Sequence, residues 1–267
     1  MSDDPFLEFK QRQRESWAGF APAATFTTPV AAHLVRFAAI RAGESVLDVG
    51  TGTGVVAITA ARAGARVSAL DLTPQLLMEA RENGKIAGHP GIAWQEGDAE
   101  KLPYADESFD VVVSQFGHMF APRPQCAVDE MRRVLKRSGR VAVATWPPEH
   151  LVGRMFALIA RNSPPPPAGV AAPPLWGSPT VIAERLAHGF GELFFERGTM
   201  IYPALSLAHY RRYIEMSIGP MRKVIESLSG APDQLGRVRA EFDSLVAPYF
   251  IENRIEQSYL LTRAHAR

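Results

Sequence analysis

Three glycines stand at alternate positions directly after a run of apolar and β-branched residues. The stretch is SVLDVGTGTGVVAI, residues 45 to 58, and it contains Gly50, Gly52 and Gly54. Without side chains these positions let backbone N–H groups approach a polar ligand closely, and a following helix adds partial positive charge. A tight turn would need only one glycine, so the spacing favours a ligand site. The stretch matches neither of two phosphate-binding loops. Val55 occupies the last glycine position of the dinucleotide-binding G-x-G-x-x-G motif, and the Gly-Lys-Ser/Thr that ends a P-loop does not follow.

Three carboxylates lie at the ends of successive apolar runs, and each suits a different part of one ligand. Asp48 precedes the glycines, where a carboxylate favours an ammonium group over a pyrophosphate. Asp71 can accept hydrogen bonds from both hydroxyls of a ribose, and Asp98 could receive the exocyclic amine of an adenine. A ligand with an amino acid end, a ribose and an adenine but no phosphate is S-adenosylmethionine. The alternatives are that Asp71 caps a helix and that Asp98 is a turn residue.

Such residues need strands whose carboxyl ends meet at one edge of a sheet, and residues 30 to 146 supply them. Apolar runs predict strands over residues 45–50, 65–71, 92–98, 109–116 and 139–146. Helical spacing and helix-ending glycines predict helices over residues 31–40, 55–64, 73–88 and 124–137. This alternation predicts parallel βαβ units with helices on both faces of an α/β sheet.

The chain changes character after Trp146. Proline-rich stretches predict that no long regular element forms between residues 147 and 179. Beyond them the patterns predict a helix over 180–190, a strand over 191–203, two helices within 206–250 interrupted near Gly219, and an edge strand over 253–267. The predicted organisation is an N-terminal helical cap (1–30), a cofactor-binding α/β core (31–146), and lid insertions with a closing helix and strands of the same domain (147–267).

Four stretches in this order resemble the motifs of class I S-adenosylmethionine-dependent methyltransferases, and most closely the type 11 group that is similar to ubiquinone/menaquinone methyltransferases. They are VLDVGTGTG, ALDLTP, GDAEKLPYADESFDVVVS and MRRVLKRSGRVAVATW. The resemblance covers roughly residues 12 to 146. It implies a Rossmann-like, doubly wound, mostly parallel seven-stranded sheet with helical lid insertions. Two positions depart from the common pattern, because Thr51 stands where many members have cysteine and KRSGR replaces KPGGR.

The resemblance also implies cofactor contacts by position. They are Asp48, Gly50, Thr51, Gly52 and Gly54 at the methionine end, Asp71 at the ribose, Leu72, Asp98 and Ala99 at the adenine, and Ser114 and Gln115 beneath the sulfonium. The cofactor would be S-adenosyl-L-methionine and its product S-adenosyl-L-homocysteine.

Methyl transfer from a sulfonium is an in-line displacement from an activated donor, so the protein mainly positions the acceptor and excludes water. A base is needed only if the acceptor must lose a proton, as a phenol or a carbon acid does. His118, in SQFGHMF after the fourth strand, is the candidate base. The alternative is a half-buried loop histidine with a backbone partner.

Aromatic and methionine side chains outside the core predict a small, apolar or aromatic methyl acceptor, with O- or C-methylation favoured. The candidate contacts are Trp17, Phe20, Met119, Tyr213 and Met216. The alternative for each is packing of the lid on the sheet. Two other functions stay open: methylation of a protein or RNA, and cofactor binding without methyl transfer.

The composition limits the classes of partner and ligand that are expected. With 29 basic and 28 acidic side chains the formal charge is +1, so the basic excess typical of nucleic-acid binders is missing and no nucleic acid is expected. Cys126 is the single cysteine, and no His, Asp and Glu cluster has metal-ligand spacing, so neither a disulfide nor a metal is expected. No signal-peptide core or membrane-spanning run is found, which predicts a cytoplasmic protein. The sequence leaves open whether the protein forms a homodimer.

Overall fold

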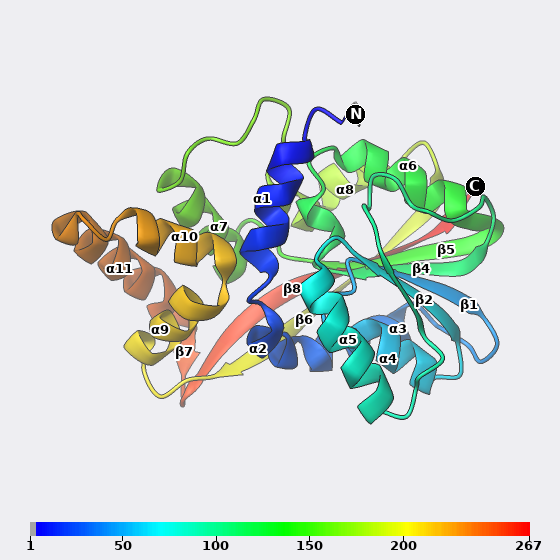
Figure 1. Ribbon diagram of the computed structural model, residues 1–267, viewed down its shortest axis with the longest axis horizontal. Helices are drawn as coiled ribbons and strands as arrows, with labels where there is room; N and C mark the ends of the chain where they lie inside the picture. Colours follow the sequence, from blue (N-terminus) through cyan, green and yellow to red (C-terminus); the bar gives the residue numbers. More distant parts are fainter. Residues whose placement is uncertain (1–3) are drawn as a thin grey trace.

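A mostly parallel sheet forms the centre of the molecule (Figure 1). The computed structural model describes residues 4–267. Within this range the strand order is β3-β2-β1-β4-β5-β8-β6, and a short β7 pairs with β8 beside this path. The strands are β1 Ser45–Val49, β2 Arg66–Asp71, β3 Ala93–Glu96, β4 Phe109–Gln115, β5 Leu135–Thr145, β6 Phe190–Pro203, β7 Phe250–Ile251 and β8 Arg254–Ala266. β1 to β5 are parallel and β8 is antiparallel to its neighbours, which confirms the predicted fold class.

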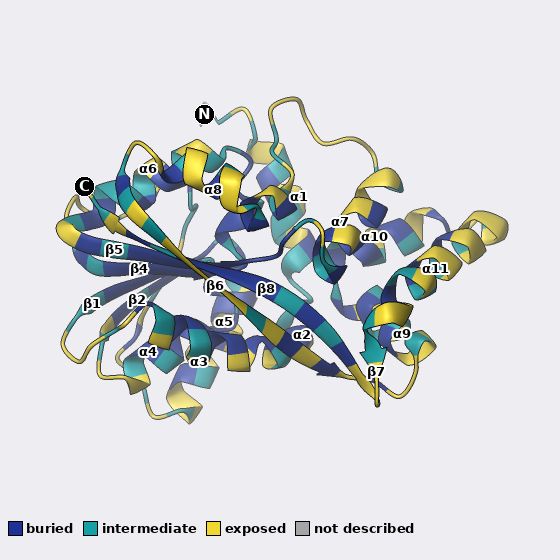
Figure 2. Ribbon diagram, turned by 180° about the vertical axis from the view of Figure 1, so that it is seen from behind, coloured by how far each residue is buried: buried dark blue, intermediate teal, exposed yellow. Residues whose placement is uncertain are grey.

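The central strands are apolar on both faces, so helices must cover both. Val111, Val112 and Val113 of β4 are fully buried although their side chains alternate between the faces. One face is covered by α3 Thr28–Phe37, α4 Val55–Arg62 and α5 Pro74–Ile86, and the other by α6 Pro124–Val134 and α8 Pro179–Leu186 (Figures 1 and 2). Because β1 and β4 are adjacent and parallel, the loops after their carboxyl ends lie side by side.

The remaining helices form a lid and an N-terminal cap. The lid contains α7 Leu151–Arg161, α9 Leu207–Ser217, α10 Gly219–Ser227 and α11 Pro232–Val246. It has an apolar core of its own, built around Tyr210, Phe242 and Val246 and separate from the core of the sheet. The cap consists of α1 Leu7–Trp17 and α2 Ala21–Ala24, and α1 lies between the lid and the sheet in Figure 1. Short 3-10 helices are η1 Thr25–Thr27, η2 His118–Phe120, η3 Pro173–Gly177 and η4 Ala247–Tyr249.

Two expectations from the sequence are wrong, one in the proline-rich part, where a helix forms, and one near β5, where a helix ends early. The prolines flank α7 without entering it, and Leu151, Met155 and Leu158 recur at helical spacing and are buried on one face. The helix expected to reach residue 137 ends at Val134, because Leu135 already pairs with β4. Sheet pairing outweighs the helix propensity of the following basic residues.

Two further expectations about the carboxyl-terminal part also need correction. The final strand β8 is not an edge strand, since it lies between β5 and β6, and its neighbouring residues Leu260 and Leu261 are both buried. Residues 206–250 form three helices, with the expected break before Gly219 and a second one between α10 and α11. Among residues 4–267 no helix has the length and apolar character that a membrane crossing requires.

Candidate functional site

The glycine loop connects β1 to α4 and touches the loop that follows β4. The N–H groups of Gly50 and Thr51 donate to the carbonyl of Leu70, at 2.8 and 2.9 Å, which fixes the turn against β2. Gly50 has φ +69°, and a β-carbon there would lie 2.8 Å from the α-carbon of Gly117. Gly52 has φ +55°, but a β-carbon there would meet nothing within 4 Å. The first glycine therefore permits loop contact, and the second leaves free space beside a cavity that both residues line.

Asp48 lies beneath this loop with no solvent exposure. Its Oδ2 accepts hydrogen bonds from the Thr51 hydroxyl at 2.6 Å and the Ala57 N–H at 3.0 Å. Its Oδ1 is buried and has no hydrogen-bond partner among the residues that the structure describes. Burial raises the pKa of Asp48 from its usual 3.8 to about 7, although these two hydrogen bonds lower it. The nearby charge of Asp71 adds a smaller upward shift. A ligand cation at Oδ1 would therefore gain a partner that the protein leaves open.

Asp71 ends β2 and lines the same cavity. Its Oδ2 accepts from the Gly52 N–H at 2.7 Å, and its Oδ1 accepts from the Thr73 N–H at 2.8 Å. Burial raises the pKa of Asp71, although these backbone hydrogen bonds oppose the shift. Each carboxylate oxygen keeps a second lone pair, so both could accept hydroxyl groups of a ligand.

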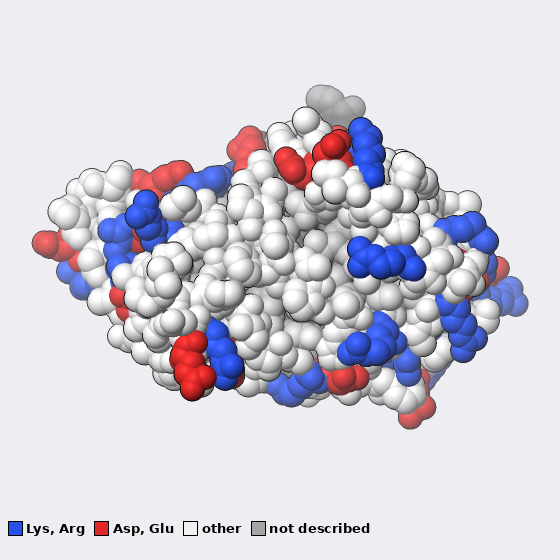
Figure 3. Space-filling model, turned by 90° about the horizontal axis from the view of Figure 1, so that it is seen from below, with Lys and Arg blue, Asp and Glu red and all other residues white. Residues whose placement is uncertain are grey.

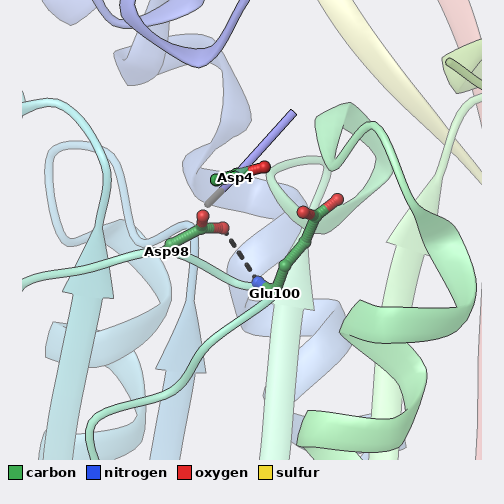
Figure 4. Close-up of side chains that lie close together, drawn as sticks. All are labelled: Asp4, Asp98 and Glu100. Atoms are coloured by element: carbon green, nitrogen blue, oxygen red, sulfur yellow. Dashed lines mark hydrogen bonds between the residues drawn. The ribbon is translucent and has the colours of Figure 1, made fainter. Parts of the chain in front are cut away.

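Asp98 belongs to a buried ionic cluster that the sequence does not reveal. Lys10 Nζ lies 2.6 Å from a carboxylate oxygen of each of Asp4, Asp98 and Glu100. Arg123 adds hydrogen bonds to Glu100 at 2.6 and 2.9 Å, and Asp98 also accepts from the Glu100 N–H at 2.9 Å (Figure 4). The three carboxylates are close enough to share a metal ion, but the lysine ammonium already lies among them. Burial alone would lower the pKa of Lys10, yet these hydrogen bonds raise it above 10.5.

The cavity brings most of the predicted site residues together. Its lining includes Asp48, Gly50, Thr51, Gly52, Asp71, Leu72, Asp98, Ala99, Gln115, Trp17, Phe20 and Tyr213. Gly54 and Ser114 lie behind the lining. Gly54 is the N-cap of α4 at φ +85° and packs against Trp94, while the Ser114 hydroxyl donates to the Val49 carbonyl at 2.5 Å. These two residues shape the loops that line the cavity.

The structure does not place His118, Met119 or Met216 at the cavity. His118 is only 1% exposed, and its ring meets Trp176 edge to face with 4.6 Å between the ring centroids. Within the described part of the chain neither ring nitrogen has a hydrogen-bond partner. Burial lowers the pKa of His118 to about 3, with a further contribution from Arg185. Met119 is buried away from the cavity and Met216 is 62% exposed. The side of this loop that does line the cavity contains Phe116, Gly117 and Phe120.

The half of the cavity away from the glycine loop is aromatic. Trp17, Phe20 and Tyr213, which the sequence predicts as acceptor contacts, lie there, and further residues come from η1, the end of β5, α7, β6, α9 and β8. The additional lining side chains are Phe26, Trp146, Met155, Phe156, Ile159, Met200, Tyr202, Tyr210 and Gln257. Gln257 donates to the Tyr210 hydroxyl at 2.7 Å. Periodicity predicts an amphipathic helix at α9, whereas no long regular element is expected where α7 lies, so the sequence does not predict the cavity-lining face of α7.

The fold is Rossmann-like, and the glycine loop and the carboxylates line a cavity at the carboxyl edge of its sheet. The methyltransferase-domain family matches residues 47–143. An uncharacterised protein of Mycobacterium tuberculosis is 33% identical over 255 residues, which is 94% of this chain and 93% of the relative. The ubiquinone/menaquinone biosynthesis C-methyltransferase of Rubrivivax gelatinosus is 41% identical over 106 residues, 40% of this chain and 41% of that enzyme. The crystal structure of the YcgJ protein of Bacillus subtilis shares the fold, with TM-score 0.61 at 20% identity over 89% of this chain and 98% of the other.

These similarities extend what the geometry indicates. The chain belongs to the type 11 family of class I S-adenosylmethionine-dependent methyltransferases. It is therefore an enzyme, and its cofactor is S-adenosylmethionine.

Proposed function

We propose that the glycine loop and the three carboxylates hold the cofactor as the sequence predicts. The unpartnered Oδ1 of Asp48 supports a contact with the ammonium of the methionine end. The open space at Gly52 supports close approach of backbone amides, and Asp71 has lone pairs for the ribose hydroxyls. Leu72, Asp98 and Ala99 would lie at the adenine, with Gln115 near the sulfonium.

We propose further that the methyl acceptor is a small apolar or aromatic molecule, with O- or C-methylation favoured. The observation that carries this proposal is the aromatic half of the cavity, where rings from the cap, the core and the lid surround one space. The ring centroids of Phe26, Tyr202 and Tyr213 lie within 6 Å of one another. Those of Trp17 and Phe120 are 4.8 Å apart. Such walls suit a flat ligand that buries most of its surface.

The acceptor half contains tyrosines and a glutamine but no carboxylate or histidine among its described lining residues. Burial raises the pKa of Tyr202 and Tyr210 above their usual 10, so these two tyrosines are neutral and act as hydrogen-bond partners. When bound, the cofactor supplies an electrophilic methyl group on a sulfonium. The chain's own contribution is then to orient a nucleophilic acceptor and to exclude water. An acceptor that ionises readily in water, such as an acidic phenol, fits this half best.

The charges argue against a nucleic-acid substrate. Basic and acidic side chains are interspersed around an uncharged centre on the face shown in Figure 3. A ribose-phosphate backbone would favour a continuous basic groove. The relatives whose names state quinone chemistry support a small aromatic acceptor, though they match over only 126 and 106 residues.

A direct experiment combines cofactor binding with a panel of acceptors. Calorimetry with S-adenosylhomocysteine measures the cofactor site, and radiolabelled methyl transfer is then measured with phenols, hydroquinones and amines. We expect transfer to a hydroxylated aromatic compound, and we expect Phe156→Ala to raise KM for it while leaving cofactor affinity unchanged. Phe194→Ala on β6 is the matched control, because Phe194 is 39% exposed and is not among the described residues that line the cavity. Tight cofactor binding with methylation of protein or RNA only, or of nothing, would contradict the proposal.

A further inference from the structure

Helix α1 forms a wall of the cavity along one of its faces. Lys10, Gln13, Arg14 and Trp17 line the cavity, and their spacing of three and four residues places them on one side of the helix. The Gln13 side chain donates to the Phe120 carbonyl at 3.1 Å, and Trp17 packs on the Phe120 ring. One helix therefore contacts both the nucleoside end and the aromatic half of the cavity.

The same helix also joins the two bodies on either side of it. On the core side, Arg14 pairs with Glu96 at 2.7 Å. On the lid side, the Lys223 ammonium donates to the Arg12 carbonyl at 3.1 Å. A β-carbon at Gly219 would lie 1.9 Å from the Ser16 carbonyl oxygen, so α10 begins in direct contact with the end of α1. Figure 1 shows α1 running between the lid helices and the sheet.

Much of what holds α1 in place is polar, although Trp17 also packs on Phe120. Its buried residues are Lys10 and Ser16, and Leu7 at its start is 43% exposed. An eleven-residue helix with so little apolar burial has low stability of its own. Its main attachment is the Lys10 ammonium, which has only 6% of its side chain exposed and contacts Asp98 and the fully buried Glu100. Removing the ammonium would leave the buried Glu100 without one of its cation partners, so these ion pairs favour α1 in its place on the cavity.

We propose that Lys10 is a positioning residue that couples cofactor binding to closure of α1. The ammonium fixes the Asp98 carboxylate at the nucleoside end, and the same helix holds Trp17 at the aromatic half. With α1 closed, the cofactor site is covered and the wall of the acceptor site is complete. With α1 open, the nucleoside end is accessible and that wall is lost. Bound cofactor and closed α1 consequently stabilise each other.

The test uses the full chain with S-adenosylhomocysteine as the probe. Hydrogen exchange of the amides in residues 7–17 reports closure of α1, and stopped-flow displacement gives the dissociation rate of the probe. We expect the probe to slow exchange across α1 in the wild type. In Lys10→Met this protection should disappear and the probe should dissociate roughly tenfold faster or more, since a charge-assisted contact on each of three carboxylates is lost.

Arg12→Met is the matched control. Arg12 lies on the same helix and is exposed, and within residues 4–267 its side chain forms an ion pair only with Glu8, at 3.8 Å. Its removal therefore changes the net charge equally without touching the cluster. Lys10→Arg keeps the positive charge on a planar guanidinium group and should restore part of the protection of α1 from hydrogen exchange. Lys10→Gln repeats the neutral substitution should the methionine variant fail to fold. Wild-type protection and dissociation rate in a folded neutral variant would overturn the proposal.

This inference rests on cofactor binding and not on the proposed acceptor. If no small molecule is methylated but the probe still protects α1 through Lys10, the proposed acceptor class fails and the coupling stands. If an aromatic acceptor is methylated while Lys10→Met behaves as the wild type, the coupling fails and the proposed function stands.

Discussion

Asp48→Asn should make the cofactor-free protein more stable at pH 8 while weakening cofactor binding. Burial raises the pKa of Asp48 from 3.8 to about 7. Below pH 3.8 the group is neutral in both the folded and the unfolded chain. As the pH rises from 3.8 to 7 the unfolded chain ionises first, so stability falls by about 1.4 kcal/mol per pH unit. Above pH 7 the ionised carboxylate therefore costs the folded state about 4 kcal/mol.

Asparagine removes this charge and keeps the shape. Its amide oxygen can accept the hydrogen bonds from the Thr51 hydroxyl and the Ala57 N–H that Asp48 accepts now. Its amino group would take the position of the unpartnered Oδ1, which costs about 1–3 kcal/mol for a buried donor without a partner. The net gain in free energy of unfolding is then about 1–3 kcal/mol at pH 8. At pH 4 folded Asp48 is neutral, so the gain is lost and the amide cost leaves the variant less stable than the wild type.

Urea unfolding at pH 8 and pH 4 measures the gain, and calorimetry at pH 8 measures the affinity for S-adenosylhomocysteine. Loss of one charged hydrogen bond should weaken that affinity roughly 10- to 150-fold. Asp110→Asn is the control of opposite sign. Although burial opposes it, the hydrogen bond from Lys136 lowers the pKa of Asp110, so this variant should be less stable at pH 8. Reduced stability of Asp48→Asn at pH 8, or an equal gain at both pH values, would refute the reasoning.

Four other substitutions separate the roles of the site residues. Gly50→Ala should destabilise the fold by about 2 kcal/mol or more, because φ +69° disfavours a side chain and the added β-carbon would meet Gly117. In Gly52→Ala the added β-carbon would meet no atom within 4 Å, so this variant should lose cofactor affinity with a smaller loss in the free energy of unfolding, measured with urea. Asp71→Asn should weaken S-adenosylhomocysteine binding about tenfold or more in calorimetry, and unchanged affinity would remove Asp71 from the site. His118→Phe should keep methyl transfer within a few-fold, whereas a general base would lose about 10²–10⁴-fold in kcat.

The cofactor half of the site is predictable from sequence because its determinants are local. Asp48 and Asp71 lie on strands that β1–β2 pairing places side by side, and a run of glycines directly after a strand indicates the edge where a ligand binds. Alternating apolar runs and helices then fix the direction of the strands. Lys10 could not be found in this way, since its partners Asp98 and Glu100 are 88 and 90 residues away.

The misplaced His118 has a local cause that sequence alone does not show. Phe116 adopts φ +63° at the end of β4, a conformation that bulky residues rarely take, and its ring stacks on Trp146 at 3.8 Å. This turn directs the following η2 helix so that His118 points away from the cavity and onto Trp176. A strand-and-loop reading places the histidine at the correct edge of the sheet but cannot give the side to which it points.

The two halves of the cavity place different demands on the chain. The cofactor half is built from the ends of neighbouring strands, so changes there disturb the sheet. The acceptor half is built largely from the cap and from a lid whose apolar core is separate from that of the sheet. Lid residues can therefore vary without loss of the cofactor site. Similarity limited to residues 47–143 consequently carries information about the cofactor, whereas the acceptor must be inferred from α1, α7, β6 and α9, where this chain's aromatic side chains gather.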